Sequence, residues 1–216
     1  MLWITLAAQL SLPTALGLPI PDARAVFSTD DMPAYVQIAG ITRFVPTRTT
    51  IGEDGIARDC SVERSSGDGK LDAYTCAIIL KRAKFQPAKW PDGTPAYGVL
   101  RLPVTWAIGE QPSEKEVQAA FPADMDVSVS RLPSGARKTT SLSLMIAVAE
   151  TGRVVGCSQA PPASKHFHPK AFPELVSIAC QQLSSQFTAV PPKDATGKPV
   201  RSVQTASVRF SATPGD

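Results

Sequence analysis

The chain has 216 residues, of which 43% are hydrophobic and 19% charged, and its formal net charge at pH 7 is +3. This composition can fill packed cores and excludes a disordered chain. A charge this small, with no Lys/Arg cluster interleaved with aromatic residues, argues against a nucleic-acid binder. The 20 prolines favour turns and short strands over a helical bundle.

The first 25 residues are predicted to be a targeting segment. No charged residue occurs from Leu2 to Ile20, and two prolines within this apolar run disfavour a membrane-spanning helix. Two signal-peptide cleavage sites present themselves, at Ala15 and Gly17 and at Ala23 and Ala25. Because no Lys or Arg precedes the run, a retained signal anchor and a buried N-terminal strand or helix stay open as alternatives.

In the first part of the chain, residues 41–51 and 56–62 read as two strands joined by a turn at 53–55. Pro46 lies inside the first strand and cannot donate to a ladder, so it marks an edge or a bulge. A helix follows, capped by Asp68, with an apolar stripe at Cys76, Ile79, Leu80 and Ala83. Residues 100–108 alternate between apolar and other side chains and predict a final strand.

The second part repeats this order. Residues 141–149 and 153–157 form the hairpin around the turn at 150–152. The apolar stripe of the next helix is Val176, Ala179, Cys180, Leu183 and Phe187, and residues 206–210 form the last strand.

Cysteine, glycine, proline and aromatic residues recur at matching spacings in the two parts. The matched pairs are Gly55 and Gly152, Cys60 and Cys157, Cys76 and Cys180, Gly93 and Gly197, Pro95 and Pro199, and Trp106 and Phe210. The offset is 97 residues at the first cysteine (60 to 157) and 104 at the second (76 to 180), which places a seven-residue insertion between the second pair. Such a long period indicates a duplicated domain rather than a solenoid.

The fold class predicted from this pattern is α+β, with two tandem β-β-α-β domains at residues 27–110 and 116–213. Each domain is an antiparallel sheet with one helix packed on it. The polar, proline-containing segment 111–115 is the expected linker.

The repeat also selects the disulfide pairing. Four cysteines allow three connectivities, and only Cys60–Cys76 with Cys157–Cys180 keeps each bond inside one copy and makes the copies alike. Each bond would staple the return strand of the hairpin to the helix and stabilise a small domain by about 3 kcal/mol. The alternatives, a metal site or a reactive thiol, are less favoured: zinc sites use close pairs such as C-x-x-C, whereas the spacings here are 16 and 23 residues. Disulfides in turn imply export to an oxidising compartment.

Catalytic machinery is not visible in the sequence, so we expect no enzyme activity, cofactor or metal. His166 and His168 lie in the inserted, proline-rich loop and are expected to be solvated. Residues 65–69 are glycine-rich but lack the spacing of a phosphate-binding loop. Trp90 and Tyr97 flank the turn at Asp92 and are candidate surface aromatics for binding, whereas Trp106 alternates with core residues and is expected to be buried.

The first copy resembles the TonB C-terminal domain family. The resemblance is carried by residues 51–67 (IGEDGIARDCSVERSSG), by Leu71 and Asp72, by residues 82–88 (RAKFQPA) and by the turn at 92–95 (DGTP). The second copy is divergent and keeps Gly152, both cysteines, Phe187 and the turn at 197–199.

The resemblance implies a periplasmic module that grips an extended segment of an outer-membrane or other envelope protein by strand addition. The candidate edge is the last strand of each copy, represented by Leu100, Leu102, Val104, Trp106, Val208 and Phe210. Nucleic acid is not an expected partner, a homodimer is compatible with the sequence, and membrane contact requires an uncleaved N-terminal segment. The long spacer of the energy transducer has no counterpart, since the first domain begins near residue 27. The alternatives are a structural envelope protein whose domains cover each other's edges and, least favoured, an enzyme.

Overall fold

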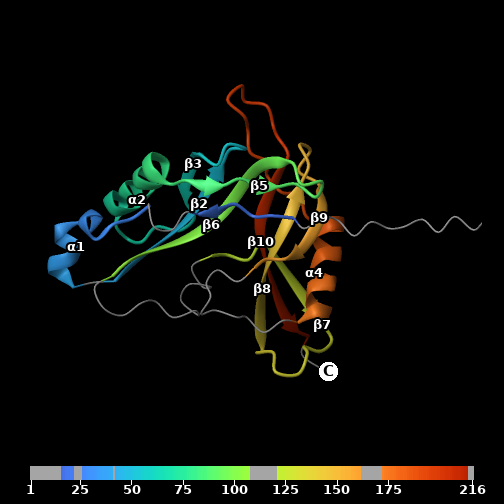
Figure 1. The fold of residues 1–216 in the computed structure, drawn as a ribbon. Helices are drawn as coiled ribbons and strands as arrows, with labels where there is room; N and C mark the ends of the chain where they lie inside the picture. The colour runs from blue at the N-terminus through green and yellow to red at the C-terminus, as the bar shows by residue number, and fades with distance from the viewer. Residues whose placement is uncertain (1–15, 22–25, 41, 108–120, 162–171, 214–216) are drawn as a thin grey trace, which may run out of the picture.

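A computed structural model describes residues 16–21, 26–40, 42–107, 121–161 and 172–213. The fold is α+β (Figure 1). In chain order the elements are β1 (Ile20–Pro21), a 3-10 helix η1 (Thr29–Asp31), α1 (Ala34–Ala39), β2 (Arg43–Ile51), β3 (Ala57–Val62), α2 (Gly69–Arg82), β4 (Phe85–Gln86), β5 (Ala88–Lys89), β6 (Pro95–Trp106), β7 (Met125–Val129), β8 (Thr139–Val148), β9 (Val154–Gln159), α4 (Pro173–Gln186) and β10 (Ser202–Ala212).

The order strand, strand, helix, strand occurs twice among these elements, as β2-β3-α2-β6 and as β8-β9-α4-β10. We call residues 43–106 the first half and residues 139–212 the second half. In each half, the glycine of the hairpin turn has a positive φ, 77° at Gly55 and 86° at Gly152. A Cβ at Gly55 would lie 2.0 Å from the carbonyl oxygen of Phe85, and a Cβ at Gly152 would lie 2.5 Å from that of Ala189. Only glycine fits these turns, because the chain leaving the helix passes against them.

Both predicted helices form, with local signals at their ends. The Asp68 side chain accepts hydrogen bonds from the backbone of Lys70 and Leu71, which caps α2 as expected. Pro173 occupies the first turn of α4, where its missing N–H costs nothing. The stripe of α2 differs from the prediction at Leu80, which is 42% exposed. Ile79 is buried as predicted, and Leu71 and Ile78 are buried in place of Leu80, because the helix contacts the sheet mainly at β3.

Both predicted disulfides are present. Cys60 joins Cys76, tying β3 to α2, and Cys157 joins Cys180, tying β9 to α4. Each bond spans the border of a hydrophobic core that lies between its helix and the sheet. Trp106 is 3% exposed in the first of these cores, as predicted, and its Nε1 donates to Thr75 Oγ1 at 2.9 Å.

The two halves do not form two separate antiparallel sheets, which corrects the sequence-based expectation. One mixed eight-stranded sheet runs in the order β3-β2-β6-β10-β8-β9, with β5 and β7 paired to β6 and β10. The join is a short parallel pairing of the two last strands, where Ser202, Val203 and Gln204 lie opposite Tyr97, Gly98 and Val99. The physical reason is that each last strand carries a free edge, and pairing the two satisfies backbone groups of both.

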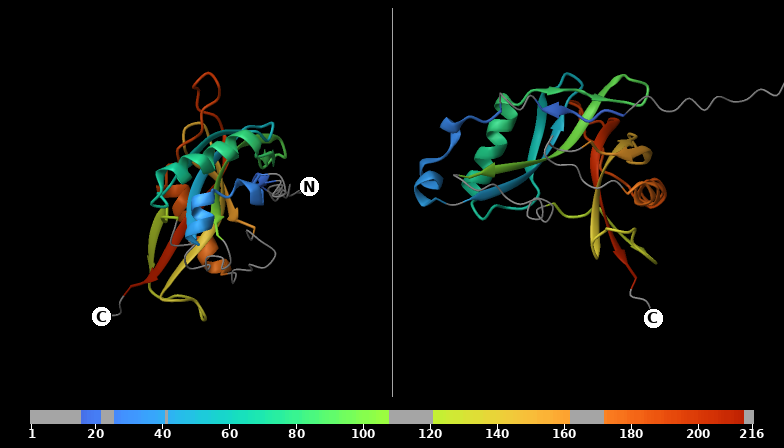
Figure 2. Two further views of the ribbon diagram at one scale, coloured as in Figure 1. Left: turned by 90° about the vertical axis from the view of Figure 1, so that its left-hand side faces the viewer. Right: turned by 60° about the horizontal axis from the view of Figure 1, so that its bottom comes forward.

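The two long helices cover opposite faces of this sheet. Leu100 of β6 points into the core under α2, and Phe210 of β10 points into the core under α4. Gln204 lies opposite Val99 in the parallel pair, so these two residues share a face. Since side chains alternate along a strand, Leu100 and Phe210 point to opposite faces. Figure 2 shows α2 and α4 well apart, on either side of β6 and β10.

Pro46 is not on an edge strand, because β2 lies between β3 and β6. Its carbonyl oxygen accepts the backbone N–H of Glu63 at 2.9 Å, just past the end of β3 at Val62. The nitrogen of Pro46 faces the same side, where β3 has already ended, so no carbonyl oxygen of β3 lacks a donor there. The position is therefore an end of one ladder rather than an edge of the sheet.

The N-terminal residues 16–21 pack onto the fold. Gly17 exchanges two backbone hydrogen bonds with Lys89 (3.1 and 2.8 Å), and β1 pairs with β4 through Ile20 and Gln86. Leu16 and Leu18 cover a small core of Ala88, Ala96, Met145 and Val203. This segment belongs to the range that the sequence assigns to a targeting peptide.

Candidate functional site

The two strands that the sequence predicts as binding edges, β6 and β10, differ in whether their edges are open. In β10, Val208 and Phe210 lie between two partners, because the strand pairs with β8 along its length and with β7 from Val208 to Ala212. This stretch is not an open edge, which corrects the prediction. The parallel strand β7 that covers it comes from a segment without a strong sequence signal.

β6 pairs with β2 on one side from Gly98 to Trp106, but on its other side β10 leaves after Val99. From Arg101 to Thr105, no strand among the described residues pairs on that second side. The predicted edge residues Leu100, Val104 and Trp106 are buried in the first core, and Leu102 packs against it.

The open side of β6 is presented by other residues than those predicted. Because the backbone of Pro46 faces β3, the backbone of its cross-strand partner Pro103 faces away from β2. Arg101, Pro103 and Thr105 therefore present the free backbone groups. Pro103 has no N–H, which blunts this edge for strand pairing.

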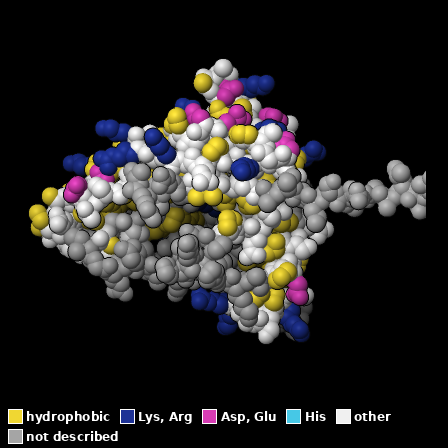
Figure 3. Space-filling model, viewed as in Figure 1, with side chains coloured by type: hydrophobic (Ala, Val, Ile, Leu, Met, Phe, Trp, Pro, Cys, Tyr) yellow, Lys and Arg dark blue, Asp and Glu magenta, His cyan; other side chains and the backbone are white. Residues whose placement is uncertain are grey.

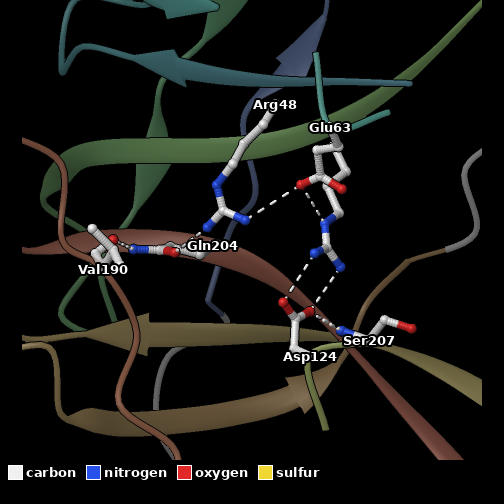
Figure 4. A network of polar contacts seen from close by, with 7 residues as sticks. Arg48, Glu63, Asp124, Val190, Gln204 and Ser207 are labelled. Carbon is white, nitrogen blue, oxygen red and sulfur yellow. Dashed lines mark hydrogen bonds and ion pairs between the residues drawn. The ribbon is translucent and has the colours of Figure 1, made fainter. Parts of the chain in front are cut away.

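The fork between the diverging strands β6 and β10 holds a partly buried polar network (Figure 4). Arg101 donates from both terminal nitrogens to the Asp124 carboxylate at 2.7 and 2.9 Å. Asp124 also accepts the backbone N–H of Ser207 at 2.7 Å, and its own N–H bonds Ser207 O at 2.8 Å. The side chains of Arg101 and Asp124 are 10% and 15% exposed. Asp124 thus connects the two last strands where their direct pairing has ended.

Glu63 and Arg48 extend this network. The Nε of Arg101 donates to Glu63 Oε1 at 2.9 Å, and Arg48 reaches the same oxygen at 3.4 Å. Arg48 also donates to Gln204 Oε1 at 3.2 Å, and Gln204 Nε2 donates to Val190 O at 3.0 Å. Two arginines face two carboxylates, so the charge is balanced, and the arrangement links the halves rather than presenting a free charge. Sequence reasoning missed this network, although two arginines inside otherwise apolar or neutral strands were a usable signal.

Trp90 and Tyr97 are half-buried rather than surface aromatics. Arg201 of the second half lies over the Trp90 ring, 5.1 Å from its centroid, and donates to Thr94 Oγ1 at 2.9 Å. Hydrogen bonds from Thr94, aided by Arg201, hold the pKa of Asp92 below its usual value. This turn is therefore a contact between the halves.

The outer strands of the sheet provide further edges. The N–H of Ala160 bonds Ser143 O, so the alternate residues Cys157 and Gln159 of β9 present their backbone groups outward, and Val155 lies at a register shift of the same strand. β9 carries no charged residue, and Val155 is 47% exposed. The opposite edge strand β3 contains charged residues, which discourage pairing with another chain.

An apolar patch lies at the far end of the molecule from α4, on α1 (Figure 3). Ile38 is 86% exposed and Tyr35 48%. The Tyr35 hydroxyl donates to Asp68 at 2.7 Å, which raises the pKa of Tyr35 and lowers that of Asp68. A shallow hollow lined by Asp30, Met32, Lys70 and Tyr74 adjoins this patch.

Within the described ranges, no group of three or more His, Cys, Asp and Glu side chains could hold a metal ion. No helix of that same part of the chain is long and apolar enough to cross a membrane. His166, His168 and the linker at 111–115 lie outside the described residues. Comparison of the chain with protein-family models, curated proteins and solved structures gives no match, so the family remains a prediction from motifs.

Proposed function

We propose that the protein is an exported, non-catalytic binding module made of two tandem β-β-α-β domains of the TonB C-terminal type. It binds an extended segment of an outer-membrane or other envelope protein by backbone pairing, in the periplasm. The two disulfides support export, since such bonds persist in oxidising compartments.

One observation carries this proposal: the fold already holds an extended segment by backbone pairing. Residues 16–21 lie antiparallel to residues 85–89, bonded through Gly17 and Lys89 and through Ile20 and Gln86. In pairing of this kind, backbone hydrogen bonds give the affinity, and the pockets that receive the side chains of the bound segment give the specificity. For a separate partner, the receptive edges are β9 and the short open stretch of β6.

In-cell photo-crosslinking tests the proposal. A photoreactive residue at Thr105 probes β6, one at Val155 probes β9, and one at Ser184 on the exposed face of α4 is the control. We expect an edge probe to capture one outer-membrane receptor or envelope protein, and an extended peptide from that protein to abolish the crosslink. Equal capture from all three positions, or none from either edge, would contradict the proposal.

A second candidate function is a self-contained structural envelope protein. It is favoured by one observation, that β10 is paired on both sides while the fork beside it is closed by Arg101 and Asp124. In that case the crosslinks from Thr105 and Val155 stay within the chain.

A further inference from the structure

The link between helix and last strand has the same backbone geometry in both halves. In the first half, Phe85 N bonds Gly55 O, and in the second half Ala189 N bonds Gly152 O, each at 2.9 Å. Further along, the bridge between Lys89 and Pro95 has its counterpart between Lys193 and Pro199. Residues 85–89 and 189–193 are therefore equivalent, at the offset of 104 that relates Cys76 to Cys180.

The two links differ in what lies beside them. The first is covered by residues 16–21, and Lys89 uses its N–H and C=O to bond Gly17. In the second link, the bonds around the Lys193 bridge are made by its neighbours, Asp194 N to Lys198 O and Val200 N to Pro192 O. Among the described residues, no group pairs with the N–H and C=O of Lys193.

The second link is also accessible. Lys193 is exposed, and Val190 is 78% exposed, a high value for an apolar side chain. Figure 1 shows the loop that follows this link standing clear of the sheet at the top of the molecule. Val190 is equivalent to Gln86, which pairs with Ile20 in the first link. In the second link, the carbonyl oxygen of Val190 already accepts a hydrogen bond from Gln204 Nε2. This acceptor is therefore not free for a partner.

We propose that the second link, residues 190–193, is a further binding site that takes an extended segment of a partner protein through the backbone of Lys193. The inference stands on the comparison of the two links and does not depend on the family resemblance or on the edges of β6 and β9.

The floor of this site determines the chemistry of the partner. Leu16 and Leu18 rest on Met145 and Val203 in the first site. At the repeat offset of 97, Arg48 stands for Met145 and Glu63 for Ala160, and both belong to the polar network of the fork. At the offset of 104, Val99 stands for Val203, so the floor keeps one apolar residue beside the two charged ones. An apolar occupant would remove these paired charged groups from water and offer them no hydrogen bond in return, which is costly. The segment that fits therefore carries polar, hydrogen-bonding side chains where residues 16 and 18 carry leucine.

Two synthetic peptides test this site on the full, oxidised protein. One copies residues 16–21, and the other is its Leu16→Gln/Leu18→Gln form. Backbone amide shifts in NMR titrations report binding, at Lys193 and the adjacent Asp194 for the second link and at Lys89 for the first; Asp194 is the reporter in the proline variant. We expect the Gln form to shift Lys193, and the Leu form to affect only Lys89, by exchange with the protein's own segment.

A matched pair of variants locates the contact. Lys193→Pro removes the proposed donor without removing any hydrogen bond between described residues, and Lys193→Ala keeps it. We expect Lys193→Pro to weaken binding of the Gln peptide about fivefold, as for loss of one hydrogen bond, and Lys193→Ala to leave binding unchanged. Equal affinity of the two variants, or no shift at Lys193 with millimolar peptide, would overturn the site. Crosslinks captured at Thr105 or Val155 would still uphold the function proposed above, so the two ideas fail separately.

Discussion

The buried ion pair between Arg101 and Asp124 gives the sharpest test of how the halves are joined. Asp124→Ala leaves the Arg101 guanidinium with Glu63 as its acceptor and deprives the Ser207 N–H of its side-chain acceptor. Removing one partner of a buried pair costs about 3–5 kcal/mol. Because both side chains keep a small exposure, water can reach the fork, and we expect the lower value, about 3 kcal/mol.

Urea unfolding of the oxidised protein measures this cost. With a slope of about 2 kcal/mol per M, a loss of about 3 kcal/mol lowers the midpoint by about 1.5 M. Asp126→Ala is the matched control: Asp126 makes a two-pronged pair with Arg209 between β7 and β10, but these side chains are 64% and 51% exposed. An exposed pair contributes about 0–1 kcal/mol. If Asp124→Ala were no more destabilising than Asp126→Ala, the fork network would not be what joins the halves.

Three further predictions concern residues 31–93. Replacing Cys60 and Cys76 together by alanine should lower the free energy of unfolding by about 3 kcal/mol, because the bond closes a loop of 16 residues; an unchanged urea midpoint would contradict this. Gly55→Ala should cost about 2 kcal/mol or more, since its Cβ would meet a carbonyl oxygen, whereas Gly93→Ala, also at positive φ but with nothing within 4 Å, should cost about 1 kcal/mol; thermal unfolding compares the two. The pKa of Asp31 is lowered, first by the Ser28 backbone N–H and then by Arg82, so its contribution is present above the unfolded pKa of about 3.9 and is lost as pH falls through the lower folded value; a stability difference between wild type and Asp31→Asn that grows toward pH 2 would refute this.

Local features of the fold were predictable because their causes lie close together in the chain. The hairpin turns follow from Gly55 and Gly152, the start of α2 from Asp68, and the burial of Trp106 from alternation along one strand. The disulfides were predictable for a different reason: the repeat left one pairing that treats both copies alike. None of these inferences needed to know how the halves meet.

The binding edges could not be predicted in the same way. Alternation identified β6 and β10 as strands, but whether a strand is open depends on its neighbours, and those are residues far away in sequence. In β10, the pairing of Val208 with β7 closes the edge, and in β6, Pro103 turns its side without an N–H toward the open edge. The apolar residues of the two strands predict neither arrangement.

The order strand, strand, helix, strand in each half, the cysteine pairing and the matching spacings could be read from the amino-acid sequence, because they depend on spacing and on local backbone preference. Tertiary contacts make the halves share one sheet, place Asp124 across the fork and pair residues 16–21 with one link, whereas none of the described residues pairs with the backbone of Lys193 in the equivalent link. These choices depend on which backbone groups remain unpaired once each half has folded. Their partners lie far away in the chain, as when Val203 pairs with Gly98, and no local sequence pattern predicts such a pairing.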